Sequence, residues 1–481
     1  MDSTLLVARS FAFVILVASV LVSRRVNGSS VANCPYWVGL GTLLLYTSYC
    51  ISGLGFGNGN SAYAELILAT LVLTSALGFG LGAGRILAVQ RQASSARQVM
   101  PVPPVGHPRV TRGYTALVLV LTLVFFTVLT DGQPWRVLTD GVELKWERLH
   151  AVSDKEAVML LLDSAVLATI LVGLSWSIIG HHDDRKSRNR LMIFVSLSVL
   201  YVLSTGSRTP MIAVIFNGIA AMTYGKAQSN FIRSVSANSK LIVSAAIAIV
   251  GLMIIVTASR IEFEGLSSAV FEIYFDIREL GVIGWLTEQG AAGFFAATLI
   301  TYAASTFNNA VIRLQELDSV TLSIGYKFAF FYITAFQKIT GGLFNDSLTA
   351  WRDLATINND HLLAISPSAT QWATLFGDVL WDFGVVLTFP LTFVTFYGAG
   401  MIVRRAACRP TLANCLLSST VISLCLLPLV NPFLSTYVHF MFFVIAAIHL
   451  VKRRRAARQP GVSPSTELTA GQLRVPKAGL V

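Results

Sequence analysis

Long uninterrupted blocks of apolar residues are the feature that most limits what this chain can fold into. An apolar run of about 18 or more residues has the length that a helix needs to cross a bilayer. The composition agrees, because 54% of the residues are hydrophobic and only 13% are charged, whereas soluble domains carry about 25% charged residues. The blocks also lack the alternation of apolar and polar residues that membrane β-strands show. The sequence therefore predicts an all-α polytopic membrane protein.

The apolar blocks predict about eleven transmembrane helices. The predicted ranges are 5–22, 35–54, 64–84, 114–130, 157–179, 191–205, 210–225, 241–258, 374–402, 411–430 and 434–451. The first block is expected to be a helix and not a cleaved signal peptide, because it lacks a basic start and further spans follow it. These ranges divide the chain into eight helices (1–258), a large loop (259–373), three helices (374–451) and a disordered tail (452–481) that is rich in Pro, Ser, Thr and Gly.

The distribution of Lys and Arg predicts how the helices are oriented. The formal net charge is +11, and the excess lies in the short segments 85–112, 181–190, 226–240 and 404–409 and at the start of the tail. Such segments stay on the cytoplasmic side of the membrane. The charge is thus explained by topology, and no nucleic-acid partner is expected. Segments 131–156 and 259–373, in which acids outnumber bases, are predicted to be external, with the N-terminus outside and the C-terminus inside.

The loop 259–373 is much longer than a connection requires, and long loops of this kind are usually functional. It contains short apolar stretches, Gly293–Ser305 and Phe328–Phe336. We expect these stretches to form re-entrant or interfacial helices that lie against the membrane. A second interpretation, that the loop contains two additional spans, remains open at this stage.

External arginines form the first candidate site. Gly206 permits a tight turn between two predicted spans, and Pro210 suits the first turn of the next helix. Arg208 would add guanidinium donors that match phosphate oxygens at a helix N-terminus, where anions bind. Arg260 is also predicted to be external and would form a paired anion clamp with Arg208. Arg278 is a third candidate, for which a salt bridge to its acidic neighbours is favoured. Each arginine has an alternative role, either as a snorkelling anchor or as the ion-pair partner of a nearby acid.

Acidic residues and one histidine form the second candidate site. Asp360 or His361 has the chemistry of a general base for a hydroxyl group, and the alternative is a polar turn that caps the next helix. Asp378 and Asp382 are four residues apart and therefore share a helix face. Carboxylates in a span normally face a wet cavity or a partner. Asp163 and His439 belong to the same class, with a structural hydrogen-bonding role as the alternative.

The sequence lacks the common motifs for cofactors and metals. The sequence contains no Walker loop, no GxGxxG at a strand–helix junction, no HExxH and no EF-hand pattern. The five cysteines show no CxxC spacing. We therefore expect no cofactor and no metal.

The order of these motifs resembles that of Wzy-type polymerases, which join lipid-linked oligosaccharide repeat units, and is most similar to the enterobacterial common antigen branch. The resemblance covers roughly residues 190–402. It is carried by the turn Gly206–Ser207–Arg208, by Arg260 after the next span, by Gly325–Tyr326 before the aromatic run, and by Leu363–Pro367 followed by Gly377–Gly384.

The resemblance implies a metal-independent glycosyltransferase without a cofactor, in the inner membrane of a bacterium with its active site facing the periplasm. It would join undecaprenyl-pyrophosphate-linked repeat units into O-antigen, common antigen or exopolysaccharide. Membrane lipid, a chain-length regulator and a flippase would be its other partners. Arg208 and Arg260 would stabilise the leaving pyrophosphate, and His361 or Asp360 would be the base. The implied substrate-binding residues are Ser207, Arg278, Tyr326, Lys327, Asp378 and Asp382.

Three alternatives remain at this point. An O-antigen ligase would use similar arginine chemistry to move finished glycan onto lipid A core. A transporter or flippase of lipid-linked sugar would carry charged residues through the bundle and would be built from repeated halves, whereas this sequence shows no internal repeat. A membrane scaffold of a glycan assembly complex would not need the arginines for polymer formation.

Overall fold

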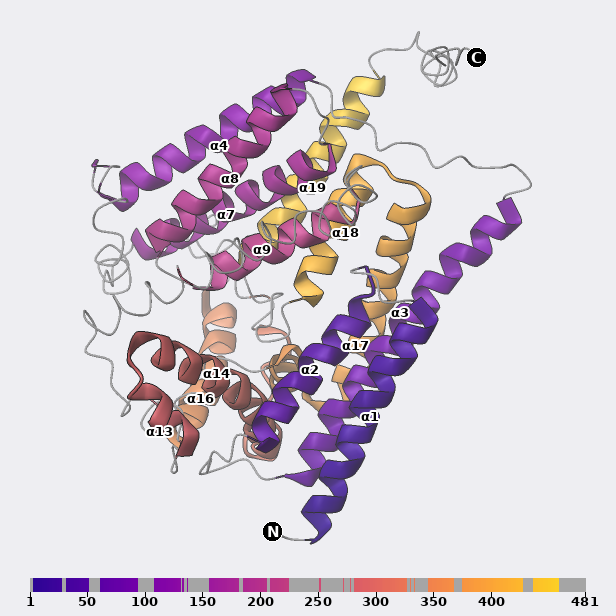
Figure 1. Ribbon diagram of the computed structural model, residues 1–481, viewed down its shortest axis with the longest axis vertical. Helices are drawn as coiled ribbons and strands as arrows, with labels where there is room; N and C mark the ends of the chain where they lie inside the picture. The colour runs from indigo at the N-terminus through magenta and orange to yellow at the C-terminus, as the bar shows by residue number, and fades with distance from the viewer. Residues whose placement is uncertain are drawn as a thin grey trace, which may run out of the picture.

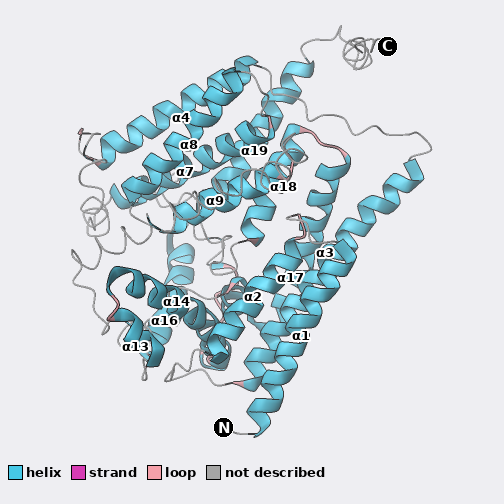
Figure 2. Cartoon of the chain, in the orientation of Figure 1, coloured by secondary structure: helices cyan, strands magenta, loops and turns pink. Residues whose placement is uncertain are grey.

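In a computed structural model, every secondary-structure element of the described residues is a helix (Figures 1 and 2). The residues described are 3–27, 32–51, 61–93, 108–130, 132, 133, 136, 155–180, 185–205, 208–224, 251, 271, 277, 281–326, 329, 333, 345–366, 374–426 and 436–457. The elements are α1 (Ser3–Asn27), α2 (Cys34–Ile51), α3 (Ala62–Ala93), α4 (Pro108–Leu129), α7 (Lys155–Ile179), α8 (Arg185–Thr205), α9 (Arg208–Met222), α13 (Gly281–Thr287), α14 (Gly290–Gln315), η1 (Leu317–Ser319), α16 (Asn345–Ile365), α17 (Leu375–Cys408), α18 (Leu412–Cys425) and α19 (Thr436–Ala457).

Several of these helices have the length and composition of membrane spans. Within the described residues, 6 helices are long and apolar enough to cross a membrane, namely α1, α3, α4, α7, α14 and α17. Large apolar side chains on α1, α4 and α17 are exposed, as expected for helix faces that contact lipid. The prediction of a helical membrane protein is thus confirmed. The predicted span 241–258 lies almost entirely outside the described residues, and the total of eleven spans stays a prediction.

The helices pack around two large apolar cores. One core is formed by α4, α7, α8, α9 and α19, with the buried Trp176 of α7 among its largest side chains. The other is formed by α1, α2, α3, α14 and α17. The short helix α18 contributes to both, through Cys415 to the first and Ile422 to the second. It therefore joins the two groups; in Figure 1 the first lies in the upper part of the molecule, and α1, α2, α3 and α17 of the second lie at the lower right.

Glycines allow α3 and α17 to approach closely. A Cβ atom added to Gly78 would lie 2.5 Å from the backbone oxygen of Phe393, and one added to Gly82 would lie 2.0 Å from that of Tyr397. The approach is reciprocal, because a Cβ on Gly400 of α17 would lie 2.3 Å from the oxygen of Phe79. Small residues four positions apart commonly form helix contacts in membranes. The crossing fixes α17, whose first turns belong to the candidate site.

The helix α17 is interrupted near its start. Gly384 has φ 72° and ψ 174°, which is not a helical conformation, and Leu375–Cys408 is therefore two helices joined by a kink. A Cβ at this position would also lie 2.9 Å from Leu322 Cδ1. Glycine tolerates positive φ at no steric cost, which is why the chain can turn here. Asp378 and Asp382 lie on the short segment before the kink, and so precede the long apolar helix.

The segment 259–373 differs from its predicted organisation. The expected short re-entrant helix at Gly293–Ser305 is instead part of α14, which has 26 residues. The sequence pattern was misleading because Asn308 and Asn309 interrupt the apolar run, but both are buried on the helix and do not end it. Most of Phe328–Phe336 lies outside the described residues.

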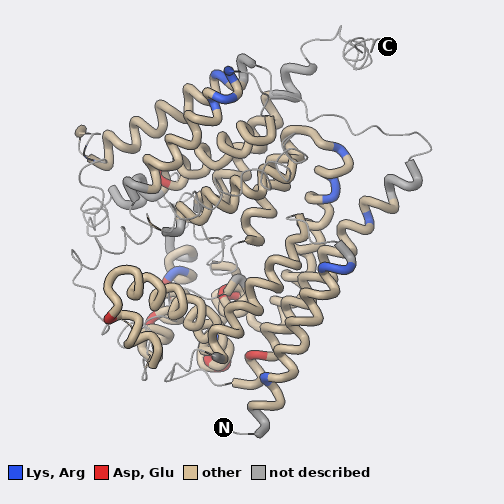
Figure 3. The backbone as a smooth tube through the Cα atoms, viewed as in Figure 1, with Lys and Arg blue, Asp and Glu red and all other residues tan. Residues whose placement is uncertain are grey.

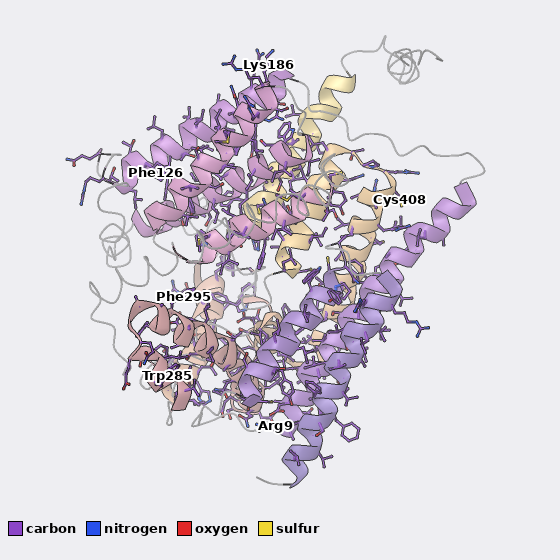
Figure 4. The ribbon with its side chains drawn as sticks, in the orientation of Figure 1. Arg9, Phe126, Lys186, Trp285, Phe295 and Cys408 are labelled. Atoms are coloured by element: carbon purple, nitrogen blue, oxygen red, sulfur yellow. The ribbon has the colours of Figure 1, made fainter. Side chains whose placement is uncertain are left out.

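Charged residues are distributed unevenly along the molecule. Figure 3 shows Lys and Arg at the start of α8 and the end of α17, on the upper side, and most of the acidic residues in the lower half. In Figure 4, Lys186 and Cys408 lie toward the upper side and Arg9 lies near the lower end. Positive charge at one end of a helical bundle is the arrangement that the predicted orientation requires.

Candidate functional site

The predicted arginine site is described only in part. The structure has the expected break between two helices, since α8 ends at Thr205 and α9 begins at Arg208. Pro210 lies in the first turn of α9, where its missing N–H is harmless. The side chain of Arg208 is not described. Four further predicted site residues lie outside the described residues: Ser207, Arg260, Arg278 and Lys327.

The alternative interpretation of residues 358–361, a polar turn that caps the next helix, is not what the structure shows. Residues 358–361 lie inside α16, which continues to Ile365. A helix forms because Leu362 and Ile365 continue an apolar face that packs on Ile312 and Trp381. Asp360 is exposed, whereas His361 is half-buried. The two candidate bases therefore lie in different environments.

One segment, Glu316–Tyr326, links α14, α16 and α17, and we call it the connecting segment. The side-chain amide of Asn358 in α16 donates to the backbone oxygen of Thr321 at 2.7 Å. The indole N–H of Trp351, also in α16, donates to the backbone oxygen of Ser323. The Ser323 hydroxyl donates to Asp382 Oδ1 of α17 at 2.6 Å. The connecting segment is thus hydrogen-bonded to a helix on each side.

A buried ion pair joins α14 to α17. Arg313, in the last turn of α14, donates through its guanidinium to Asp378 Oδ1. The two side chains are 1% and 7% exposed. The first turn of α17 also has a side-chain cap, because Thr374 Oγ1 accepts a hydrogen bond from the N–H of Gly377 at 3.2 Å. Asp378 therefore has a structural partner inside the protein.

The predicted pair Asp378 and Asp382 does lie on one helix face, but neither side chain is exposed. Asp378 is 5% exposed as a residue and Asp382 is fully buried. Their contacts are with Arg313 and with Ser323 of the connecting segment. The structure thus brings both carboxylates to the junction of α14, the connecting segment and α17. The role it shows for them is to hold this junction together.

Tyr326 ends the connecting segment and is also packed inside the protein. It is 8% exposed, and its ring meets that of Trp351 edge to face with 5.6 Å between centroids. Burial raises the pKa of the Tyr326 phenol, and the nearby Asp353 adds to this effect while Arg352 opposes it. The phenol is therefore neutral at physiological pH.

A hydrogen-bonded contact between two half-buried residues lies at the surface of this junction. Nε2 of His361 in α16 is 3.0 Å from Oε2 of Glu316, the C-cap residue of α14. Their side chains are 37% and 28% exposed, so both can be reached from outside. Beneath them is a small apolar core of Ile312, Leu362 and Trp381. Sequence reasoning identified His361 but not Glu316, because the partners are 45 residues apart.

Sequence reasoning also missed a polar cluster at the ends of α1, α2 and α3. Glu65, which is fully buried, accepts from Arg9 Nε at 3.1 Å and from the Tyr46 hydroxyl at 2.8 Å. The Arg9 guanidinium carbon also lies 5.4 Å from the centroid of the Tyr49 ring. The rings of Tyr46 and Tyr49 contact Phe307 of α14. The sequence contains one indication of this cluster, because Arg9 and Glu65 are charged residues inside apolar blocks.

Asp163 has a structural partner as well. Its Oδ1 accepts a hydrogen bond from the Tyr201 hydroxyl at 2.6 Å, between α7 and α8, and both residues are buried. This contact supports the structural alternative for Asp163.

Comparison with known proteins gives no further guide to the site. No family model matches the chain, and neither the curated proteins nor the solved structures contain a significant match.

Proposed function

We propose that this protein is a polymerase of oligosaccharide repeat units carried on undecaprenyl pyrophosphate. The donor is a growing glycan on the lipid pyrophosphate, and the acceptor is one repeat unit on the same carrier. The acceptor hydroxyl loses its proton to a base as its oxygen bonds to the donor anomeric carbon. The bond from that carbon to the pyrophosphate oxygen breaks, and the electron pair leaves with undecaprenyl pyrophosphate.

The observation that carries the proposal is the gathering of ionisable groups away from the basic helix ends. The pairs Arg313–Asp378 and Glu316–His361 lie together where α14, α16 and α17 meet. In Figure 1, the end of α8 and the start of α9 are on the side of the upper helices nearer to α13, α14 and α16. A lipid-linked substrate must react at a membrane surface, and of these four side chains the partly exposed His361 and Glu316 can be reached from outside. A transporter would instead need ionisable groups along a path through the bundle.

The proposal gives the arginines an electrostatic role. The leaving group is a pyrophosphate, so the reaction needs fixed positive charge where negative charge develops. Arg208 stands at a helix N-terminus, where backbone N–H groups also favour an anion. Arg260 is proposed to act with it. The helices α13, α14 and α16 would hold two lipid-tethered substrates in register and so supply proximity.

The proposal can be tested by complementing a gene-deletion strain of the source bacterium. Wild type is expected to restore a ladder of glycan lengths on a gel, and Arg208→Ala or Arg260→Ala to give only single-repeat glycan at normal protein level. Arg188→Ala, an exposed arginine at the opposite end of α8, is the matched control and is expected to keep the ladder.

Other outcomes identify the alternatives. A full ladder from well-expressed Arg208→Ala and Arg260→Ala would remove the arginine mechanism and favour a scaffold. Loss of external glycan in the deletion strain, including the single-repeat form, would favour a transporter. Accumulation of long glycan still on undecaprenyl pyrophosphate would favour a ligase.

A further inference from the structure

Glu316 is fixed in position by the backbone around it. It is the C-cap residue of α14, and its N–H donates to the oxygen of Ile312 at 3.0 Å. Its own backbone oxygen accepts from the N–H of Ser319 at 3.0 Å. Arg313, one turn earlier, is tied to α17 through Asp378. The backbone that carries the Glu316 carboxylate is therefore held in place by hydrogen bonds within its own segment and by the contact of Arg313 with α17.

His361 is fixed from the other side by α16. The next residue, Leu362, is fully buried against Ile312 and Trp381. Asn358, one turn earlier, is hydrogen-bonded to Thr321 of the connecting segment. Because these contacts set the rotation of α16, they also set the direction in which the imidazole leaves the helix. The distance of 3.0 Å between Nε2 and Oε2 thus joins two positioned groups.

The chemistry of the pair determines which imidazole nitrogen carries the hydrogen. An ionised carboxylate only accepts hydrogen bonds, so the neutral imidazole must carry its hydrogen on Nε2 to make this contact. Nδ1 then has the lone pair. An acid that holds a histidine in one tautomer, and that stabilises the cation formed after proton transfer, is a recurring arrangement in enzymes.

We infer that Glu316 is the positioning residue for a general base, His361, which takes the acceptor hydroxyl proton on Nδ1. This inference rests on the proposed polymerase function. In the step, the O–H bond of the acceptor breaks and the new N–H bond forms on Nδ1. The oxygen bonds to the anomeric carbon while the pyrophosphate leaves with the electron pair of the old bond. Glu316 keeps its charge and balances the imidazolium. In this assignment His361, and not its exposed neighbour Asp360, takes the proton.

The inference can be tested on the full chain in nanodiscs with two measurements. The first is the ¹⁵N spectrum of labelled histidine, in which His361→Gln identifies the His361 signal among the 7 histidines. We expect the Nε2–H tautomer in wild type and a mixture in Glu316→Gln, since an amide can either accept or donate. Asp318→Asn, the same change at an exposed acid two residues away, is the matched control and is expected to leave the tautomer unchanged.

The second measurement is the rate of repeat-unit coupling with an undecaprenyl-pyrophosphate-linked repeat unit of the source strain. Glu316→Gln is expected to lower kcat about tenfold or more, on the scale of general-base catalysis, with little change in KM. The double variant Glu316→Gln/His361→Ala is expected to match His361→Ala, since Glu316 acts through the histidine. Asp360→Asn is expected to retain its kcat.

Each contrary result has a distinct meaning. A wild-type tautomer in Glu316→Gln, or an unchanged kcat in that variant, would overturn the positioning role. A loss of activity in Asp360→Asn with none in His361→Ala would move the base to Asp360. A third result is possible, in which wild type couples no repeat units although the tautomer depends on Glu316. The polymerase proposal and the general-base role of His361 would then both fail. The contact between His361 and Glu316 would still be supported.

Discussion

Removal of Arg313 should be among the most destabilising single changes in the described part of the protein. Arg313→Ala leaves Asp378 without its guanidinium partner, and the two side chains are only 1% and 7% exposed. Removal of one member of a buried ion pair typically costs about 3–5 kcal/mol, because a buried charge is left uncompensated. Since about 1.4 kcal/mol corresponds to a factor of ten, the ratio of folded to unfolded protein should fall by roughly two to three and a half orders of magnitude.

A surface pair in the same region provides the control for this prediction. Arg352 and Asp353 of α16 are 3.5 Å apart, with side chains 54% and 59% exposed. Pairs of this kind contribute less than about 1 kcal/mol, so Arg352→Ala should change stability little. The double variant Arg313→Met/Asp378→Leu removes both charges, and it should be more stable than Arg313→Ala because apolar replacement of a buried pair is often tolerated.

The assay is unfolding of the purified variants in mixed micelles, followed by circular dichroism and by the fraction that remains monodisperse. The expected order of stability is wild type and Arg352→Ala first, then the double variant, then Arg313→Ala. Equal stability of Arg313→Ala and Arg352→Ala would refute the argument from burial. A double variant that is no more stable than Arg313→Ala would show that the unpaired charge on Asp378 is not what destabilises the single variant.

Three further predictions concern packing, and thermal stability in detergent checks each of them. Gly82→Ala should destabilise the protein by about 1–3 kcal/mol, because the added Cβ would lie 2.0 Å from a backbone oxygen of α17. Gly80→Ala is the control and should be neutral, because its Cβ would meet no atom within 4 Å. Equal effects of the two changes would argue against the α3–α17 crossing. Tyr46→Phe should lower the free energy of unfolding by about 1–3 kcal/mol, because it removes a hydrogen bond to the buried Glu65 carboxylate. Tyr63 is exposed, so Tyr63→Phe should have no measurable effect. The reverse order would argue against the hydrogen bond between Tyr46 and Glu65. Gly384→Ala should destabilise by about 1–3 kcal/mol, because φ is 72° there, and an unchanged midpoint would argue against the kink.

Hydropathy predicted five of the six described helices that are long enough to span a membrane, namely α1, α3, α4, α7 and α17, because their apolar blocks are long and uniform. The start of α9 was also predictable, since Gly206 and Pro210 have a local meaning that does not depend on the rest of the fold. The full length of α14 was not predicted, because Asn308 and Asn309 are polar residues of a type common in loops. Their burial on the helix cannot be read from the residue type. The kink at Gly384 was missed because a glycine inside an apolar block gives no sign of its backbone angle.

The candidate site was predictable in its residue types but not in its partners. Sequence analysis singled out His361 and Asp378 as unusual, yet their partners Glu316 and Arg313 were only two members of a charged segment. The contact of Arg9 with Glu65 spans 56 residues, and no local pattern specifies such a pair. Asp378 and Asp382 were expected to bind substrate, whereas the structure places them in buried contacts. Burial and pairing depend on tertiary packing, which a single sequence does not show.

The most direct test of the proposed function is reconstitution of the purified full chain in liposomes with labelled undecaprenyl-pyrophosphate repeat unit. The account predicts a ladder of products that differ by one repeat, with release of undecaprenyl pyrophosphate in equal amount. It also predicts that Arg208→Ala loses the ladder while Arg188→Ala keeps it. A folded wild-type protein that yields only single repeats, or an Arg208→Ala variant with a full ladder, would contradict the account.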